Sequence, residues 1–139
     1  MIKMSNRNIS LQISAYAYSC IEEVSDRDYS GKYKTLVKKL GQLILKNGLI
    51  QTLVFFQSKE KKEHDLLIKH LAEWWLQSPL LDFNLEINYS ENKKIRTKNK
   101  KVIEKIVNLD SSKYKNCAKE GIKLSIWLAR LADGMVADE

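Results

Sequence analysis

The sequence predicts an all-α protein, folded as a single-domain helical bundle of about six helices over residues 1–139. The main observation is that apolar residues recur at three- and four-residue steps along nearly the whole chain, which is the period of a helix buried on one face. One proline and five glycines are too few for the many turns of a β-sandwich. A hydrophobic content of 44% and a charged content of 29% are typical of one globular domain.

The first half of the chain predicts three helices. One runs from about Ser5 to Val24. A second, with an apolar stripe over 33–44, ends at Asn47-Gly48, because these residues tolerate left-handed backbone geometry. The next segment, 49–56, is apolar on nearly all sides, and its helical surroundings favour a short buried helix over a short buried strand.

The second half predicts three more helices around an irregular loop at about 78–94. A wide apolar face with two tryptophans defines a helix that Pro79 ends. The loop has no clear period beyond a few alternating residues, which fits an ordered loop or a short edge strand. A fifth helix covers 95–109, and a sixth begins at one of the capping residues in 110–112.

The chain has 24 Lys and Arg residues against 17 Asp and Glu, a net charge of +7. This charge is compatible with a polyanionic partner, and equally with genome bias or solubility. Two cysteines, Cys20 and Cys117, lack disulfide or zinc-ligand spacing, so we expect reduced, buried thiols and a cytoplasmic location. The first ten residues lack the apolar core of a signal peptide. No apolar run reaches the roughly 18–20 residues that span a bilayer, so we expect no membrane contact.

Residues suited to catalysis are few, and we expect neither an enzyme nor a bound metal or cofactor. The His64-Asp65 dipeptide matches metal phosphohydrolases of the HD type, but these need further His and Asp ligands, and no upstream His exists. His70 lies on the apolar face of its helix and is expected in the core. A Cys–His nucleophile pair is disfavoured because both thiols lie on apolar stripes, where burial raises the thiol pKa.

Basic residues are more clustered than the composition requires. The stretch 29–59 contains no acid, and Lys32, Lys39 and Lys46 flank one side of its apolar stripe; a second cluster occupies 93–105. On the last helix, basic residues fall within about 80° of arc, roughly opposite the apolar face. Like charges four residues apart repel, so this stripe suits phosphates, although a solvated surface is the alternative. The predicted nucleic-acid-binding residues are Lys34, Lys38, Lys98, Lys101, Lys105, Lys115, Lys119, Lys123 and Arg130.

Three apolar residues are candidates for a partner interface. Trp74 and Trp75 point about 100° apart on a helix and cannot share one stacking platform; Trp74 is central in the apolar arc, whereas Trp75 lies at its edge. Ile126 and Trp127 lie off the inner face of the last helix, beside the basic stripe, where exposed apolar groups suggest a protein partner. Packing against the loop at 80–92 is the alternative for the latter pair. The predicted interface is therefore Trp75, Ile126 and Trp127.

Three stretches resemble a known family, in order and at similar spacing over nearly the whole chain. The first runs from Tyr33 to Phe56, and its most specific part is Asn47-Gly48-Leu49-x-x-Thr52-Leu53-x-Phe55. The others are Leu67-x-x-x-Leu71-x-x-Trp74 and Tyr114-x-x-Cys117-Ala118-x-Glu120-x-Ile122-x-Leu124-x-x-Trp127-Leu128-x-Arg130-Leu131-Ala132. Together they resemble the small helical subunit of the type III-B CRISPR Cmr effector complex, the antiviral RAMP module. The Asn-Gly-Leu-x-x-Thr block favours this family over the related type III-A subunit.

The resemblance implies a six-helix domain without catalytic activity. It implies copies of the subunit that stack along a filament of RNA-binding backbone subunits, beside the large polymerase-like subunit. The guide RNA–target RNA duplex would then run in the groove between the two filaments. The motif residues Asn47, Gly48 and Thr52 are interpreted as structural, forming a turn with positive φ and a helix start. The assignment of RNA contacts to the basic residues rests on their clustering, not on the family.

Two functions outside this family stay open. Residues 43–59 form a helix, a glycine turn and a second helix, the pattern of a helix-turn-helix DNA regulator. A recognition helix needs polar side chains at the base edges, whereas 49–56 is almost entirely apolar. The second is a helical adaptor bundle without nucleic-acid contact.

Overall fold

The computed structural model describes residues 8–90 and 94–138. Within these ranges it contains six α-helices and no strand, which confirms the predicted all-α bundle. The start expected near Ser5 lies outside the described residues. The helices are α2 (Ile9–Ser25), α3 (Ser30–Asn47), α4 (Leu49–Lys59), α5 (Lys62–Gln77), α6 (Ile95–Val107) and α7 (Ser111–Met135).

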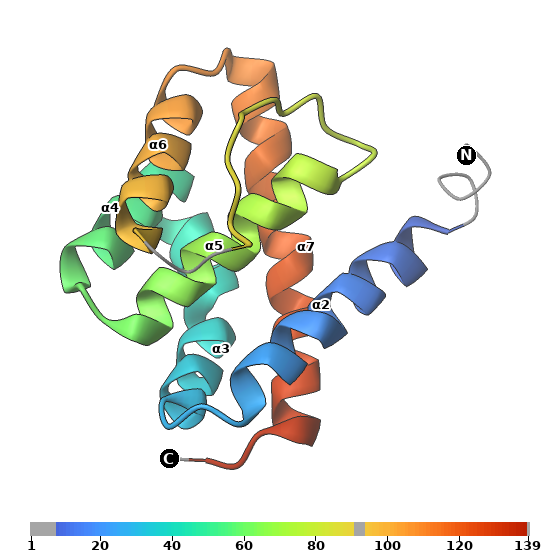
Figure 1. The fold of residues 1–139 in the computed structure, drawn as a ribbon. Coiled ribbons are helices and arrows are strands. Elements are labelled where there is room, and N and C mark those ends of the chain that lie inside the picture. The colour runs from blue at the N-terminus through green and yellow to red at the C-terminus, as the bar shows by residue number, and fades with distance from the viewer. Residues whose placement is uncertain (1–7, 91–93, 139) are drawn as a thin grey trace.

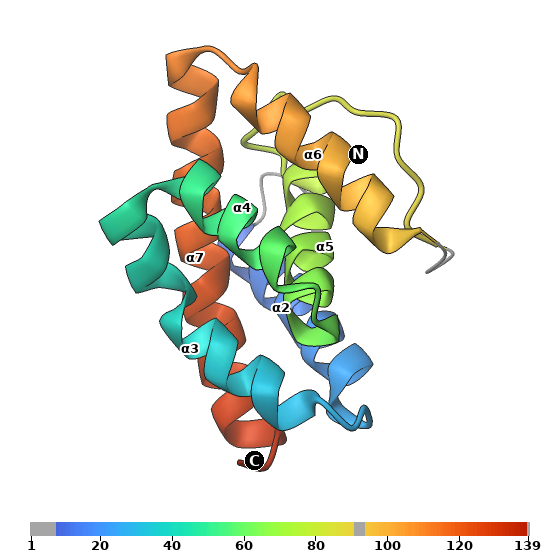
Figure 2. The same cartoon turned by 90° about the vertical axis from the view of Figure 1, so that its left-hand side faces the viewer.

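The helices form two groups that share α5. The long helix α7 packs along both α2 and α3, while α4, α5 and α6 pack against one another at the other end of the molecule (Figures 1 and 2). Helix α5 also contacts α2, α3 and α7 and therefore joins the two groups. Its fully buried residues include Leu67, Leu71, Trp74 and Trp75, so the wide apolar face predicted for this segment is the centre of the core.

The chain reversal between α3 and α4 is built on Gly48, which has φ 87° and ψ 160°. Few residues other than glycine adopt this backbone conformation. The Tyr114 hydroxyl of α7 accepts hydrogen bonds from the Leu49 amide at 3.0 Å and the Ile50 amide at 3.2 Å. The Thr52 hydroxyl donates to the Gly48 carbonyl at 2.8 Å. These contacts confirm that the Asn-Gly-Leu-x-x-Thr block is a structural motif: it begins a helix and ties it to α7.

We expect Gly48→Ala to lower the free energy of unfolding by about 1–3 kcal/mol, because a Cβ disfavours this backbone conformation. The added Cβ itself meets only the Tyr114 hydroxyl, at 3.6 Å, so the cost arises from the backbone and not from a clash. Urea unfolding measures it. Gly134→Ala is the matched control: it adds a methyl group in the last turn of α7, where no atom other than the neighbouring backbone of that helix lies within 4 Å. The control should be neutral or slightly stabilising, and equal losses in both variants would contradict the strain argument.

The segment between α5 and α6 is an ordered loop in its described part, which was one of the two expectations for it. Phe83 and Tyr89 are both buried in the core. The Tyr89 hydroxyl donates to Asn99 Oδ1 at 2.6 Å, and Asn99 Nδ2 donates to the Asp65 carbonyl at 3.0 Å. The loop is therefore held to both helices that it connects.

The prediction of a buried helix at 49–56 is wrong for two of its apolar residues. Val54 and Phe55 are 50% and 49% exposed, whereas Leu49, Leu53 and Phe56 are fully buried. Helix α4 packs on α3, α5 and α6, and its remaining side faces outward. An apolar surface is thus left uncovered beside the Gly48 turn.

Candidate nucleic-acid interface

Helix α7 displays the predicted basic stripe on its exposed side. Lys115, Lys119, Lys123 and Arg130 are all exposed, while the opposite face, from Cys117 to Ala132, is buried. At 1.5 Å per residue, the stripe extends over roughly 22 Å. Lys115, Lys119 and Arg130 form no ion pair with any residue that the structure describes. These three cations are therefore free to meet an anion along one line.

Lys123 differs from the other members of the α7 stripe. Its Nζ lies 3.2 Å from Oε2 of Glu120, a carboxylate that is 3% exposed and also accepts a hydrogen bond from Trp74 Nε1 at 3.1 Å. Burying a charge without a partner is costly. Lys123 therefore has a structural role, because it neutralises the buried Glu120 from the surface side.

The α6 cluster is only partly available to a ligand. Lys101 is exposed, whereas Lys98 and Lys105 are half-buried. Its arginine, Arg96, has two acceptors: Nε lies 2.9 Å from Oδ2 of Asp65 in the first turn of α5, and Nη2 lies 2.6 Å from the carbonyl of Glu60, which caps the end of α4. Arg96 thus fastens α6 to α5.

Two of the predicted RNA-binding lysines have partners near the C-terminal end of α7. Lys34 is 7% exposed, donates to the Val136 carbonyl at 2.8 Å and lies 2.9 Å from Asp138 Oδ1. The prediction for Lys34 is therefore wrong: its side chain packs inward and ties α3 to the chain end. Lys38 is exposed but lies 3.0 Å from Asp133 Oδ1. Both lysines were predicted from the clustering of basic residues, which does not show that Asp133 of α7 and Asp138 beyond its end lie opposite them.

The predicted partner interface is also corrected at one residue. Trp75 is fully buried, and its Nε1 donates to the Cys117 carbonyl at 3.0 Å, so it cannot lie at an interface. The error arose because α5 is covered on nearly all sides, whereas a surface helix would leave the edge of its apolar arc exposed. Ile126 is 48% exposed, and Trp127 is half-buried against the core. These two residues remain candidates for a partner contact.

The histidines lie in two different environments. His70 is 1% exposed; its Nε2 lies 2.8 Å from Glu23 Oε1 and its Nδ1 lies 2.6 Å from the Tyr33 hydroxyl, so the predicted core location is confirmed. His64 Nδ1 lies 3.4 Å from Glu63 Oε2 without forming a hydrogen bond. Burial lowers the pKa of His64, so this contact is not an ion pair at neutral pH. No group of three or more metal-ligating side chains occurs among the described residues.

Both cysteines are buried, as the sequence predicted, and neither forms a disulfide with a described residue. Cys20 is 2% exposed and Cys117 is 1% exposed. Burial raises the pKa of the Cys20 thiol strongly and that of Cys117 to about 12. A thiol, and not a nucleophilic thiolate, is therefore present at neutral pH.

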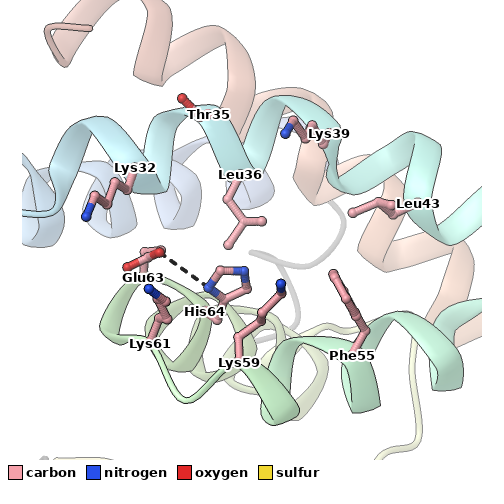
Figure 3. Close-up of a pocket in the computed structure, with 10 residues that line it drawn as sticks. All are labelled: Lys32, Thr35, Leu36, Lys39, Leu43, Phe55, Lys59, Lys61, Glu63 and His64. Carbon is pink, nitrogen blue, oxygen red and sulfur yellow. Dashed lines mark ion pairs between the residues drawn. The ribbon is translucent and has the colours of Figure 1, made fainter. Parts of the chain in front are cut away.

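Tertiary packing creates a second basic site, which we call the lysine cleft. Lys32 and Lys39 of α3 face Lys59, the last residue of α4, and Lys61, which precedes α5, across a cavity of about 500 Å³ (Figure 3). Phe55 is also part of the lining. All four lysines are exposed, and none forms an ion pair with another described residue. The lysine flank of α3 is visible in the sequence, but no sequence signal indicates that it faces Lys59 and Lys61.

Helix α4 offers little support for a DNA-reading role. Its exposed positions include Val54 and Phe55, where a recognition helix would present polar side chains to base edges. Among the described residues, no helix is both long enough and apolar enough to cross a membrane.

These features define the class of the protein: a small helical bundle with exposed basic faces. The model of the family described as CRISPR-associated protein (Cas_Cmr5) matches residues 9–135. The chain therefore belongs to the Cas_Cmr5 family, and the resemblance found in its sequence is confirmed.

Two relatives illustrate the similarity. The CRISPR system Cmr subunit Cmr5 of Thermotoga maritima is 33% identical over 70 residues, which make up 50% of this chain and 51% of the relative. The aligned part thus spans about half the length of that protein. The crystal structure of a CRISPR-associated Cmr5 family protein from Thermus thermophilus matches with a TM-score of 0.73, covering 94% of this chain and 99% of the other. At 21% identity, this match shows a shared fold.

Proposed function

We propose that this protein is a non-catalytic subunit of a cytoplasmic CRISPR Cmr effector complex and that its basic α7 face contacts the guide RNA–target RNA duplex. The family match over 9–135 supports membership of such a complex, as does the relative named a Cmr subunit. The observation that most supports an RNA contact is the line of cations Lys115, Lys119 and Arg130 along the outer side of α7, none of which forms an ion pair with a described residue. The proposed partners are the backbone and large subunits, the RNA duplex and further copies of the chain.

The proposed mechanism is electrostatic. Lysine and arginine neutralise phosphates without reading base sequence, and guide pairing supplies the specificity. Ile126 lies at 48% exposure within the same exposed arc as the cations. With the half-buried Trp127, it supplies an apolar contact for a neighbouring subunit beside the RNA. The protein would thereby hold the duplex and the filament together.

A tagged pull-down from the native host tests membership of the complex. We expect several larger subunits and RNA species of discrete length to co-purify with the tagged protein. Denaturing gels of the bound protein and of the bound RNA detect them. Ile126→Glu should reduce recovery of those subunits, because it places a charge in the proposed contact. Tyr18→Glu is the control: it changes a side chain on α2 that is similarly exposed, at 47%. Recovery of the protein alone, without RNA, would contradict the proposal.

Charge reversal on α7 tests the RNA contact. We expect the triple variant Lys115→Glu, Lys119→Glu, Arg130→Glu to bind a labelled RNA duplex at least about tenfold more weakly, because three phosphate contacts are lost. For the unmodified chain, the logarithm of the binding constant should fall against the logarithm of salt concentration with a slope of about −2 to −3. Fluorescence anisotropy across a salt series measures both. Lys123 is left unchanged, since reversing it would place two carboxylates together at Glu120.

The control is an equal change of charge elsewhere on the surface. Lys46, Lys62 and Lys100 are exposed and lie outside the predicted set and the lysine cleft. Their triple reversal to Glu should weaken binding much less than the α7 variant. Equal weakening by the two variants would show that net charge matters and the α7 face does not. A slope near zero would contradict phosphate binding altogether.

A further inference from the structure

We propose that the lysine cleft and the apolar groove beside it form a site for one unpaired nucleotide of a single-stranded RNA segment. This inference rests on the proposed RNA function and extends it to a second face of the molecule, made by α3, α4 and the start of α5. The phosphate would lie among Lys32, Lys39, Lys59 and Lys61. The base would lie against the ring of Phe55.

The charge of the cleft favours an anion. Its four lysines are exposed, and the structure records no ion pair for any of them within the described ranges. The one acidic side chain that lines the cleft, Glu63, is 8% exposed and turned toward His64 (Figure 3). Four like charges around one cavity repel each other, and a bound phosphate relieves that repulsion.

The neighbouring groove suits a base. Phe55 and Leu43 line both hollows, so the ring of Phe55 separates the lysine cleft from a second cavity of about 440 Å³. That groove is also lined by the apolar side chain of Val54 and by the amides of Asn47 and Gln51. Both amide side chains are exposed, and no hydrogen bond to another described residue is recorded for them. Asparagine and glutamine amides can donate to and accept from the edge of a base.

Phe55 is positioned to couple the two hollows. Its ring is 49% exposed, although it belongs to a helix whose other aromatic residue, Phe56, is fully buried. Lys59 Nζ lies 4.8 Å from the centre of the Phe55 ring, one helical turn away. A cation held beside an aromatic face is the arrangement by which single strands are bound, with the phosphate on the cation and the base stacked on the ring.

The geometry favours an unpaired nucleotide over a duplex. Bases within an A-form helix are stacked and paired, and its deep, narrow major groove does not admit side chains. A base can reach the Phe55 ring only if it is unstacked. A phosphate-bearing single strand therefore fits both hollows, whereas the α7 stripe offers cations without an exposed aromatic ring.

The test uses the full chain and a labelled single-stranded oligoadenylate RNA of about ten nucleotides. We expect Phe55→Leu to weaken binding about tenfold, because leucine keeps the apolar surface and removes the stacking face. Phe55→Tyr should bind as the unmodified chain does, because it keeps an aromatic ring at this position. Tyr18→Leu, which removes a similarly exposed ring on α2, should leave it unchanged.

A charge variant tests the phosphate contact separately. Lys32→Gln with Lys39→Gln should make the salt slope shallower by up to about 0.7, the effect of losing one phosphate contact on a single strand. The control is Lys46→Gln with Lys100→Gln, which removes the same number of charges outside the lysine cleft. In NMR spectra, the RNA should shift the signals of Gln51, Phe55 and His64.

Three results would overturn this inference alone, and a fourth would refute the proposed function on which it rests. RNA shifts confined to α7, with Phe55→Leu binding normally, would leave the proposed function standing and remove this site. If tripolyphosphate bound in the cleft and Phe55→Leu bound oligoadenylate as tightly as the unmodified chain, the cleft would be an anion site only. If Phe55→Leu instead weakens association with a Cmr subunit and leaves RNA binding intact, the occupant is a protein segment. If the unmodified chain binds no RNA at all, the proposed RNA function itself is refuted.

Discussion

Replacing Trp75 by alanine is expected to lower the free energy of unfolding by about 3–5 kcal/mol, the usual cost of removing a large buried aromatic side chain. Trp75 is fully buried, its ring lies 6.0 Å from that of Phe83, and its indole N–H donates to the Cys117 carbonyl. The substitution leaves a cavity between α5, α7 and the loop. Since a typical domain is stable by about 5–15 kcal/mol, a large share of the folded state is lost. Urea unfolding followed by circular dichroism measures the effect.

Two variants control this result. Trp75→Phe keeps most of the apolar volume and should cost about 1–2 kcal/mol, because the cavity is smaller. Trp127→Ala removes a tryptophan that is only half-buried, so its cost should be well below that of Trp75→Ala. An unchanged unfolding curve for Trp75→Ala, together with a weakened partner contact, would contradict the core role of Trp75. It would instead support the interface role predicted from the sequence.

Acid is expected to destabilise the protein through a buried network on α2, α3 and α5. Glu23 accepts from His70 Nε2 at 2.8 Å and lies 3.0 Å from Lys69 Nζ. The His70 hydrogen bond, followed by Lys69, lowers the pKa of Glu23 from 4.5 to about 2. Burial lowers the pKa of His70, so the ring is neutral at pH 7 and its Nδ1 accepts from the Tyr33 hydroxyl.

The direction of the pH effect follows from these two pKa values. As pH falls, Glu23 takes up a proton near its ordinary pKa in the unfolded chain and only near pH 2 in the folded chain. The contribution of Glu23 to the free energy of unfolding is therefore complete above its ordinary pKa and is lost as pH falls toward about 2. That contribution is on the order of 3 kcal/mol. His70 adds to the loss from about pH 6.5 downward, because the unfolded ring binds a proton that the buried ring resists.

Urea unfolding at about pH 7, 5 and 3 measures this dependence. We expect Glu23→Gln to be less stable than the unmodified protein at neutral pH and to lose less stability between the two lower values. Glu22→Gln is the control, since Glu22 is the adjacent residue and its side chain is exposed. A parallel decline in all three proteins would show that Glu23 does not govern the acid response.

Much of the fold could be predicted from the sequence, because helical periodicity and local stop signals act over a few residues. The stop at Asn47-Gly48 was predicted because a left-handed residue is needed there, and Gly48 indeed has φ 87°. The family motif was likewise readable, since its spacing is a property of the chain. Errors appeared where one helix is covered from several sides: Trp75 looked like an edge residue on an isolated helix and is fully buried.

The candidate site was less predictable, because charge in a sequence does not show which acids lie opposite. The arc of Lys115, Lys119, Lys123 and Arg130 on the outer side of α7 is a property of one helix, so helical geometry alone placed it correctly. Lys34 was misassigned because Asp138 and the Val136 carbonyl, about a hundred residues away in the chain, are its partners.

The sequence by itself therefore determined the helices, their turns, the buried thiols and the family of this protein, all of which depend on local pattern. Only the tertiary structure decided which cations are free and which are paired. It also created the lysine cleft, by placing Lys32 and Lys39 opposite Lys59 and Lys61, and it left Phe55 exposed at the rim. These outcomes depend on how α3 packs against the α4–α5 connection, a contact between segments whose separate patterns contain no information about each other.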